Sequence, residues 1–121
     1  MEKILNLTQH AATAEQIAAG VVEPADKIVV QALLTFEELP TAGEIKRRAR
    51  SLSEFAATSG CKTAMIGGAP FFMGPLEYAL ATAGIKALYA FSRRETVEEK
   101  LPDGGVKKTQ VFRHAGFVST F

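Results

Sequence analysis

Two adjacent arginines and a serine follow an apolar run near the C-terminus. Residues 87–91 are apolar and strand-forming, and Ser92, Arg93 and Arg94 come directly after them. Guanidinium groups bind phosphate oxygens in a bidentate fashion, so this arginine pair suits a phosphodiester better than a neutral metabolite. Ion pairs with the glutamates that follow are the alternative, and the sequence leaves both open.

A second polar group ends the N-terminal apolar run, residues 3–8. Asn6, Thr8 and Gln9 could contact a ligand, and the Gln9 amide could hydrogen-bond a base edge. His10 follows them and could transfer protons near neutral pH. The alternative for His10 is that it caps a loop or a neighbouring helix. For His114, the other histidine, a catalytic role and a structural, partly buried role are both open.

A diglycine turn is the third candidate. Gly67 and Gly68 lie between a predicted buried strand, residues 62–66, and a predicted helix, residues 72–83. Free backbone N–H groups at such a helix start favour anions. The turn matches neither a P-loop nor a Gly-x-Gly-x-x-Gly pattern, so a tight turn without ligand explains it equally well.

The remaining pattern predicts the elements that position these groups. Capping boxes at Thr13 and Thr41 open two helices, which end at Gly20 and Gly60. Residues 24–34 favour a helix but leave a strand open, and residues 95–100 and 106–112 flank a turn as a β-hairpin. The expected fold is α/β, a Rossmann-like and mostly parallel sheet flanked by helices with a C-terminal β-hairpin. The carboxyl ends of its parallel strands should bring the three candidate groups together around one cavity at the same edge of the sheet.

Length and composition limit the class of protein. The 121 residues, 47% of them hydrophobic, predict a single domain over residues 1–121 with its own core. The apolar stretches are too short to span a membrane, and the N-terminus turns polar too early for a signal peptide, so we expect a cytoplasmic protein. One cysteine and two histidines lack metal-ligand spacing, and we expect no metal and no cofactor.

The charge distribution favours a small anionic partner. The net charge is +1, but residues 1–40 hold two basic and six acidic residues, whereas residues 86–121 hold seven basic and four acidic ones. This field is too mild for duplex nucleic acid, which we do not expect as a partner. Small anions held locally, such as a nucleotide, are compatible with it.

The C-terminal third resembles a known family. Residues 88–99, which contain Ser92-Arg93-Arg94, are followed by Asp103-Gly104-Gly105 and by the pattern Phe-x-His-x-x-Phe at residues 112–117. In this order they are similar to small standalone CRISPR-associated proteins of the CARF-like, ring-nuclease type, mainly over residues 86–118. The Asn-Leu-Thr-Gln-His ending of the first strand adds weaker support.

The resemblance implies a Rossmann-like homodimer that binds a cyclic oligoadenylate or a related nucleotide second messenger in antiviral defence. It implies ligand contacts by Ser92, Arg93 and Arg94 and the Gly67-Gly68 turn. Some members of the family cleave the ligand without metal, and for such a step we expect His10 to act in proton transfer and Arg93, or else Arg94, in charge neutralisation. The sequence leaves open whether the chain is a slow phosphodiesterase or a binding protein. The alternative function is a non-enzymatic small-molecule or protein-interaction module that forms a homodimer.

Overall fold

Strands and helices alternate along residues 2–120, the part of the chain that the computed structural model describes. The elements are β1 (Ile4–Leu7), α1 (Ala14–Ala18), β2 (Val21–Val22), α2 (Lys27–Leu34), α3 (Ala42–Thr58), β3 (Thr63–Ile66), α4 (Pro70–Thr82), β4 (Lys86–Lys100) and β5 (Val106–Val118). The strands form one sheet in the order β2-β1-β3-β4-β5. The fold is therefore α/β, as the sequence predicts.

The sheet is mixed. β1 pairs in parallel with β2 and β3, and β3 pairs in parallel with β4, whereas β4 and β5 pair antiparallel. The parallel pairing of the strands predicted at residues 3–8, 62–66 and 87–91 is confirmed, and so is the C-terminal hairpin. β2 was not predicted, because two valines after Gly20 carry no alternation that distinguishes a strand from a loop.

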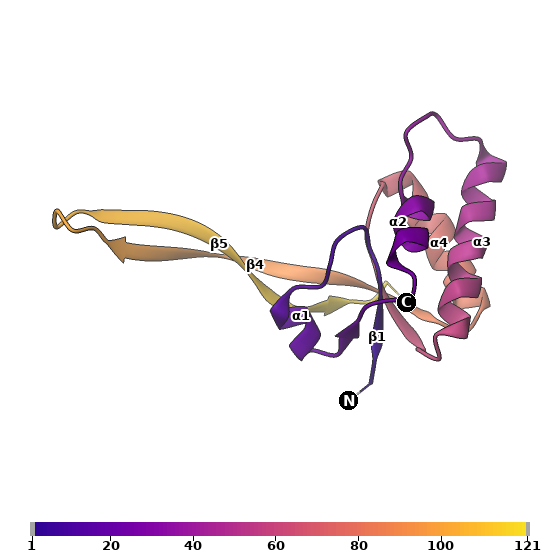
Figure 1. The fold of residues 1–121 in the computed structure, drawn as a ribbon, viewed down its shortest axis with the longest axis horizontal. Coiled ribbons are helices and arrows are strands. Elements are labelled where there is room, and N and C mark those ends of the chain that lie inside the picture. The colour runs from indigo at the N-terminus through magenta and orange to yellow at the C-terminus, as the bar shows by residue number, and fades with distance from the viewer. Residues whose placement is uncertain (1, 121) are drawn as a thin grey trace.

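The two faces of the sheet are covered unequally. α2, α3 and α4 cover one face and build the main core with β1, β3 and β4, in which Leu7, Leu52 and Leu76 are fully buried. Across the sheet, Ile4, Val21 and Met65 form a smaller cluster. α1 and the loop before it lie on that side of the sheet (Figure 1). No helix among the described residues is long and apolar enough to cross a membrane.

Helix starts follow from their capping residues. Thr13 and Gln16 form the predicted capping box of α1, and the Thr41 hydroxyl accepts a hydrogen bond from the Glu44 amide at 3.1 Å. α2 begins three residues later than its proline suggests, because the Asp26 carboxylate caps it by accepting from the Val29 amide at 3.2 Å. α4 begins at Pro70, two residues before the predicted start, since proline suits the first turn of a helix.

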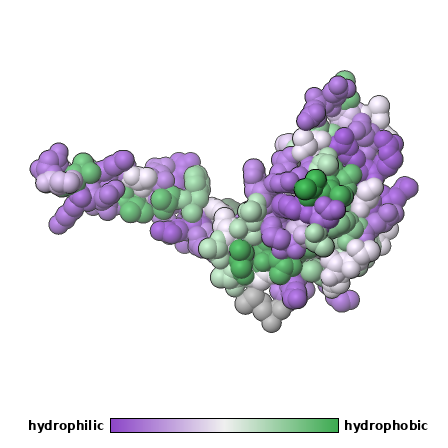
Figure 2. All heavy atoms as spheres, viewed as in Figure 1, coloured by the Kyte–Doolittle hydropathy of each residue, from purple (hydrophilic) through white to green (hydrophobic). Residues whose placement is uncertain are grey.

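The C-terminal hairpin is longer than predicted and extends far from the rest of the molecule (Figure 1). The predicted strands at residues 87–91 and 95–100 are one continuous strand, because Ser92 to Arg94 remain paired with β5. We call residues 91–116 the arm. Figure 2 shows hydrophilic and hydrophobic side chains interspersed along it. Most of its residues are exposed, while Val111, His114 and Gly116 are partly buried.

Candidate functional site

A cavity of about 420 Å³ lies where β1 and β3 end, beside Tyr89 and Ala90 of β4. We call it the edge cavity. Its walls come from the loop after β1, from α1, from the end of β3 and from the first half of β4, and its lining includes Thr8, His10, Thr13, Gln16, Gly67 and Tyr89. The connections from β1 to β2 and from β2 to β3 cross opposite faces, so the strand order reverses between β1 and β3. Open α/β sheets bind ligands at such a reversal.

Asn6 holds the loop that carries His10. Its side chain is fully buried, and its amide group donates to the His10 carbonyl at 2.8 Å and to the Glu23 carboxylate at 2.5 Å. The amide oxygen of Asn6 accepts from the Thr8 backbone N–H at 3.0 Å and from the Thr8 hydroxyl at 2.7 Å. All four bonds lie within the protein. Asn6 therefore positions Thr8 and His10 and does not face the cavity.

Lys27 supports the same loop from α2. Its ammonium group donates to the carbonyls of Thr8 at 2.8 Å and His10 at 3.0 Å, and it lies 3.8 Å from Glu23. Burial lowers the pKa of Lys27, and the Glu23 carboxylate opposes that effect. The lysine is thus a structural cation close to the site, and only its three-dimensional position reveals this role.

Gln9 points away from the edge cavity. Its side-chain amide donates to the Thr35 hydroxyl at 3.0 Å and to the Leu34 carbonyl at 3.3 Å. The backbone carbonyl of Gln9 accepts from the Gln31 side-chain amide at 2.9 Å. These contacts fasten the loop to the C-terminal end of α2. The predicted base-reading role of Gln9 finds no support in this orientation.

The diglycine turn lies against the loop after β1. A Cβ atom on Gly67 would stand 3.6 Å from the Thr8 methyl group, and Gly68 has a φ of +149° that side chains rarely adopt. α4 follows with no side-chain cap at its start. Gly67 therefore leaves space in the cavity wall and Gly68 permits the turn, so the two predicted glycines have different tasks.

The arginine pair is divided between two faces of the arm. Successive residues of a strand point to opposite sides, so Ser92 and Arg94 share the face of Ala90, which lines the cavity, and Arg93 lies on the other. Arg93 stands opposite Arg113, and the Arg94 guanidinium lies 5.6 Å from the Phe112 ring centroid. None of the three lines the edge cavity. Ser92 and Arg94 continue its floor outward along the arm.

A bulge brings His114 to the same face. Phe91 pairs with Gly116 and Ser92 pairs with His114, so β5 contains one additional residue between them. The His114 ring then packs 4.8 Å from the Phe117 ring, and its Nδ1 atom is buried with no hydrogen-bond partner among the described residues. Buried nitrogens are normally paired, so this one is an exception.

Tyr89 closes the cavity on the β4 side and contacts α4. Burial, together with a hydrogen bond to Glu77 and the negative charge of that carboxylate, raises the pKa of Tyr89 to about 12. Glu77 also accepts from the Thr120 hydroxyl at 2.6 Å. The phenol is therefore neutral at any physiological pH and could donate or accept a hydrogen bond, but it cannot act as a base there.

The Tyr89 environment predicts a loss of stability in alkali. Above pH about 10 an unfolded tyrosine ionises, whereas folded Tyr89 keeps its proton until about pH 12, so the free energy of unfolding should fall across that interval. In Tyr89→Phe this contribution is absent, and urea unfolding at about pH 9 and 11 should show a smaller fall than in the wild type. Equal falls in the two proteins would contradict the assignment.

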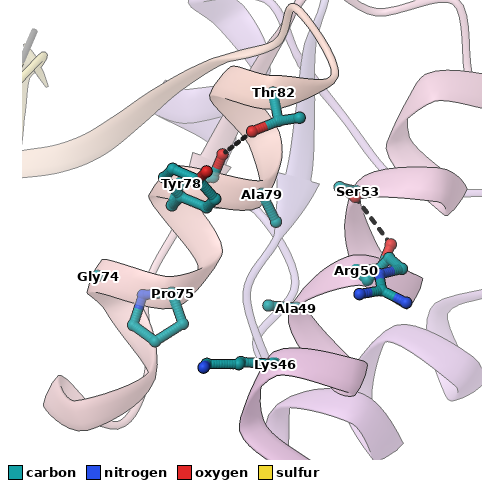
Figure 3. A pocket seen from close by; sticks show the side chains of 9 residues that line it. All are labelled: Lys46, Ala49, Arg50, Ser53, Gly74, Pro75, Tyr78, Ala79 and Thr82. Carbon is teal, nitrogen blue, oxygen red and sulfur yellow. Dashed lines mark hydrogen bonds between the residues drawn. The ribbon is translucent and has the colours of Figure 1, made fainter. Parts of the chain in front are cut away.

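A larger hollow of about 590 Å³ runs between α3 and α4 (Figure 3). Small residues such as Ala49, Gly74 and Ala79 create it, and two of its hydroxyl groups bond locally, since Ser53 donates to the Arg50 carbonyl at 2.8 Å and Thr82 to that of Tyr78 at 2.9 Å. No strand end reaches it. The edge cavity, with its converging polar groups, is the better candidate despite its smaller volume.

The structure thus brings together Thr8, His10 and Gly67 of the predicted site residues. Asn6, Gln9 and Gly68 support the loops, and Ser92 and Arg94 lie farther out, with Arg93 on the opposite face. Sequence reasoning missed Thr13, Gln16 and Tyr89, although the capping box at Thr13 placed two of them directly after His10. Among residues 2–120 no three His, Cys, Asp or Glu side chains gather into a possible metal site.

Comparison with known proteins finds a family whose model covers most of the chain. The model of a family described as "Uncharacterized protein MJ1673 family" matches residues 2–118. The chain matches no curated protein and no solved structure.

Proposed function

This chain belongs to the Uncharacterized protein MJ1673 family, and we propose that it binds a small anionic nucleotide, a cyclic oligoadenylate or a related second messenger, in the edge cavity. One observation carries the proposal: Thr8, His10 and the Gly67 backbone meet where the strand order reverses. We also propose that the parallel part of the sheet is Rossmann-like, because its strand order reverses between β1 and β3. The proposed setting is cytoplasmic CRISPR-type antiviral defence, which rests on the resemblance of residues 86–118.

The cavity and the arm offer complementary contacts to such a ligand. Met65 and Ala90 give apolar surface for a base, while Thr8 and His10 give polar groups for a ribose or phosphate. Farther along the same face, Ser92 and Arg94 are exposed and could bind a second phosphate. An elongated ligand with several phosphates fits this row better than a single nucleotide.

Slow cleavage would use the ligand's own nucleophile. The 2′-oxygen attacks the adjacent phosphorus, the bond from phosphorus to the 5′-oxygen breaks, and the proton lost by the 2′-hydroxyl is balanced by one gained at the 5′-oxygen. His10 is exposed at the cavity and could move that proton. We assign charge neutralisation to Arg94 in place of Arg93, because Arg94 shares the face of the cavity floor.

Removal of the Arg94 guanidinium should weaken binding. We expect Arg94→Ala to raise the dissociation constant for cyclic oligoadenylates about tenfold or more, since a charge-assisted contact is lost. Arg113→Ala is the matched control, because Arg113 lies on the opposite face and pairs with Glu95 at 3.7 Å. Thermal shift and calorimetric titration with a panel of ring sizes measure the effect. Equal affinities for the two variants would remove Arg94 from the site.

Incubation with ligand in the presence of a chelator separates an enzyme from a binding protein. Chromatography should show linear or 2′,3′-cyclic phosphate products with the wild type and intact ligand with His10→Ala. Intact ligand with both proteins, after long exposure to excess protein, would leave a binding function alone.

The second candidate function is an interaction module that binds no nucleotide. The observation in its favour is the arm, which exposes Phe91, Val106 and Phe112 to solvent. It predicts no response to any nucleotide in the same titrations.

A further inference from the structure

The arm is a two-stranded ribbon that extends away from the rest of the protein. Beyond Phe91 and Gly116 only β4 and β5 pair with each other, over the register from Ser92–His114 to Lys100–Val106. Two-stranded ribbons are marginally stable in water, and a third strand or a packed face is normally required. Phe91 is 54% exposed and Phe112 is 66% exposed. A third strand or another packed surface would therefore stabilise the arm.

β4 has a free edge along the arm. β3 pairs with β4 only as far as Met65 and Leu88, so from Ala90 outward the edge of β4 that faces away from β5 has no neighbouring strand among the described residues. Unpaired edges of this kind accept another strand through backbone hydrogen bonds.

The charges along this edge are arranged in two blocks. Arg93 and Arg94 precede Thr96, and Glu98 and Glu99 follow it at matching distances. Arg93 and Glu99 form no ion pair within the described chain, and the contact of Glu98 with Lys108 is long, at 3.9 Å between exposed groups. Within the arm Glu98 and Glu99 stand opposite Lys108 and Lys107, whereas Arg93 stands opposite Arg113, so the basic block has no acidic residue directly opposite it in β5.

The two blocks complement each other when the strand meets a second copy of itself. In an antiparallel pair centred on Thr96, Arg93 stands opposite Glu99 of the partner subunit, and Arg94 stands opposite Glu98 of the partner subunit. The two-fold axis repeats both pairs, which gives four attractive contacts. Phe91 meets Leu101 of the partner subunit, and the two Thr96 side chains meet at the axis, a favourable pair of β-branched residues.

Neighbouring registers are unfavourable. A two-fold axis normal to the sheet leaves side chains of the same strand face on the same side of the sheet in both copies. The axis must therefore pass between two copies of the same residue, and the nearest alternative registers are centred on Glu95 or Val97. Centred on Glu95, the two Glu95 carboxylates oppose each other and all four attractive pairs are lost. Centred on Val97, Arg94 opposes Lys100 of the partner subunit and Glu95 opposes Glu99 of the partner subunit. Like charges directly opposite destabilise a sheet, so the order of charges selects Thr96.

We infer that two copies of this chain pair through the free edges of β4, antiparallel about a two-fold axis at Thr96, to form the four-stranded sheet β5-β4-β4-β5. The interface is isologous, as a two-fold axis requires. Its occupant is another copy of the same chain because the complementarity lies within one strand.

The pairing also brings a cation toward the edge cavity, a consequence that rests on the proposed function. Lys100 of the partner subunit stands opposite Ser92, on the face that Ser92 and Arg94 share. On that face Glu98 of the partner subunit also stands opposite Arg94, so the pairing adds one basic and one acidic group beyond the edge cavity.

Charge reversal tests the interface. Sedimentation velocity should show a wild-type dimer that weakens with added salt, and Arg93→Glu with Arg94→Glu should weaken it at least about tenfold, as should Glu98→Arg with Glu99→Arg. An equimolar mixture of these two variants should recover a dimer, because all four pairs become attractive again. Unchanged circular dichroism and melting temperature exclude unfolding. A monomeric wild type, or a dimer that either reversal leaves intact, overturns the interface.

A disulfide tests the register. In a Cys61→Ala background, Thr96→Cys should crosslink two chains upon mild oxidation, because directly opposite Cα atoms in an antiparallel pair lie about 4.5–5.5 Å apart. Thr109→Cys, on the outer strand of the arm, should not. A crosslink in the Thr109→Cys variant, or none in the Thr96→Cys variant, contradicts the register. Neither experiment includes nucleotide, so a confirmed dimer without ligand binding would refute the proposed function and leave the interface intact.

Discussion

We expect Asn6→Ala to lower the free energy of unfolding by about 2–4 kcal/mol and to abolish ligand binding. The substitution removes four hydrogen bonds from a fully buried side chain and leaves the Glu23 carboxylate and the Thr8 amide without those partners. The loop that carries His10 then loses its attachment to β1. Urea denaturation measures the first effect, and calorimetric titration of a cyclic oligoadenylate measures the second.

Ser53→Ala is the control for this prediction. Ser53 is also buried, but its hydroxyl makes only the local bond to the Arg50 carbonyl at 2.8 Å. We expect a cost of about 1 kcal/mol or less and unchanged binding, because α3 lies on the other side of β1 and β3 from His10. A cost for Asn6→Ala as small as that for Ser53→Ala would show that the Asn6 network does not hold the loop.

Gly67→Leu should block the edge cavity and leave the fold intact. Gly67 does not have a positive φ, and a Cβ atom there makes only ordinary contact with Thr8 at 3.6 Å, so the backbone accepts a side chain. The leucine branch would occupy part of the 420 Å³ volume. A clash of about 1–3 kcal/mol with any ligand corresponds to roughly a tenfold to hundredfold loss of affinity.

Gly74→Leu is the matched control. Gly74 lines the hollow between α3 and α4, and no heavy atom lies within 4 Å of a Cβ atom built on it. The same glycine-to-leucine change therefore fills the competing hollow. Loss of binding in Gly74→Leu, with full binding in Gly67→Leu, would move the site to the helical face.

Sequence patterns predicted the body well because its signals are local. The hydroxyl caps at Thr13 and Thr41 and the apolar runs of β1 and β3 report directly on the elements they form. β4 was divided in error because the polar residues Ser92 to Arg94 resemble a strand end until β5 is placed beside them. The two valines of β2 form a strand only through parallel pairing with β1.

The site was predicted in part for a different reason. Strand ends of a parallel sheet meet at one edge, so Thr8, His10 and Gly67 could be grouped without coordinates. Whether a side chain faces the ligand or the protein depends on hydrogen bonds from distant elements, as with Gln9 and its contact to Thr35 at 3.0 Å. The separation of Arg93 from Arg94 follows from strand periodicity, but only once the strand is known to continue through both.

The most direct test is a map of amide chemical shifts in ¹⁵N-labelled protein titrated with cyclic oligoadenylates. The proposed site predicts concentration-dependent shifts at Thr8 to His10, at Gly67 and at Ser92 to Arg94. Binding in the edge cavity would be contradicted by spectra that do not change at any ring size, or by shifts confined to α3 and α4.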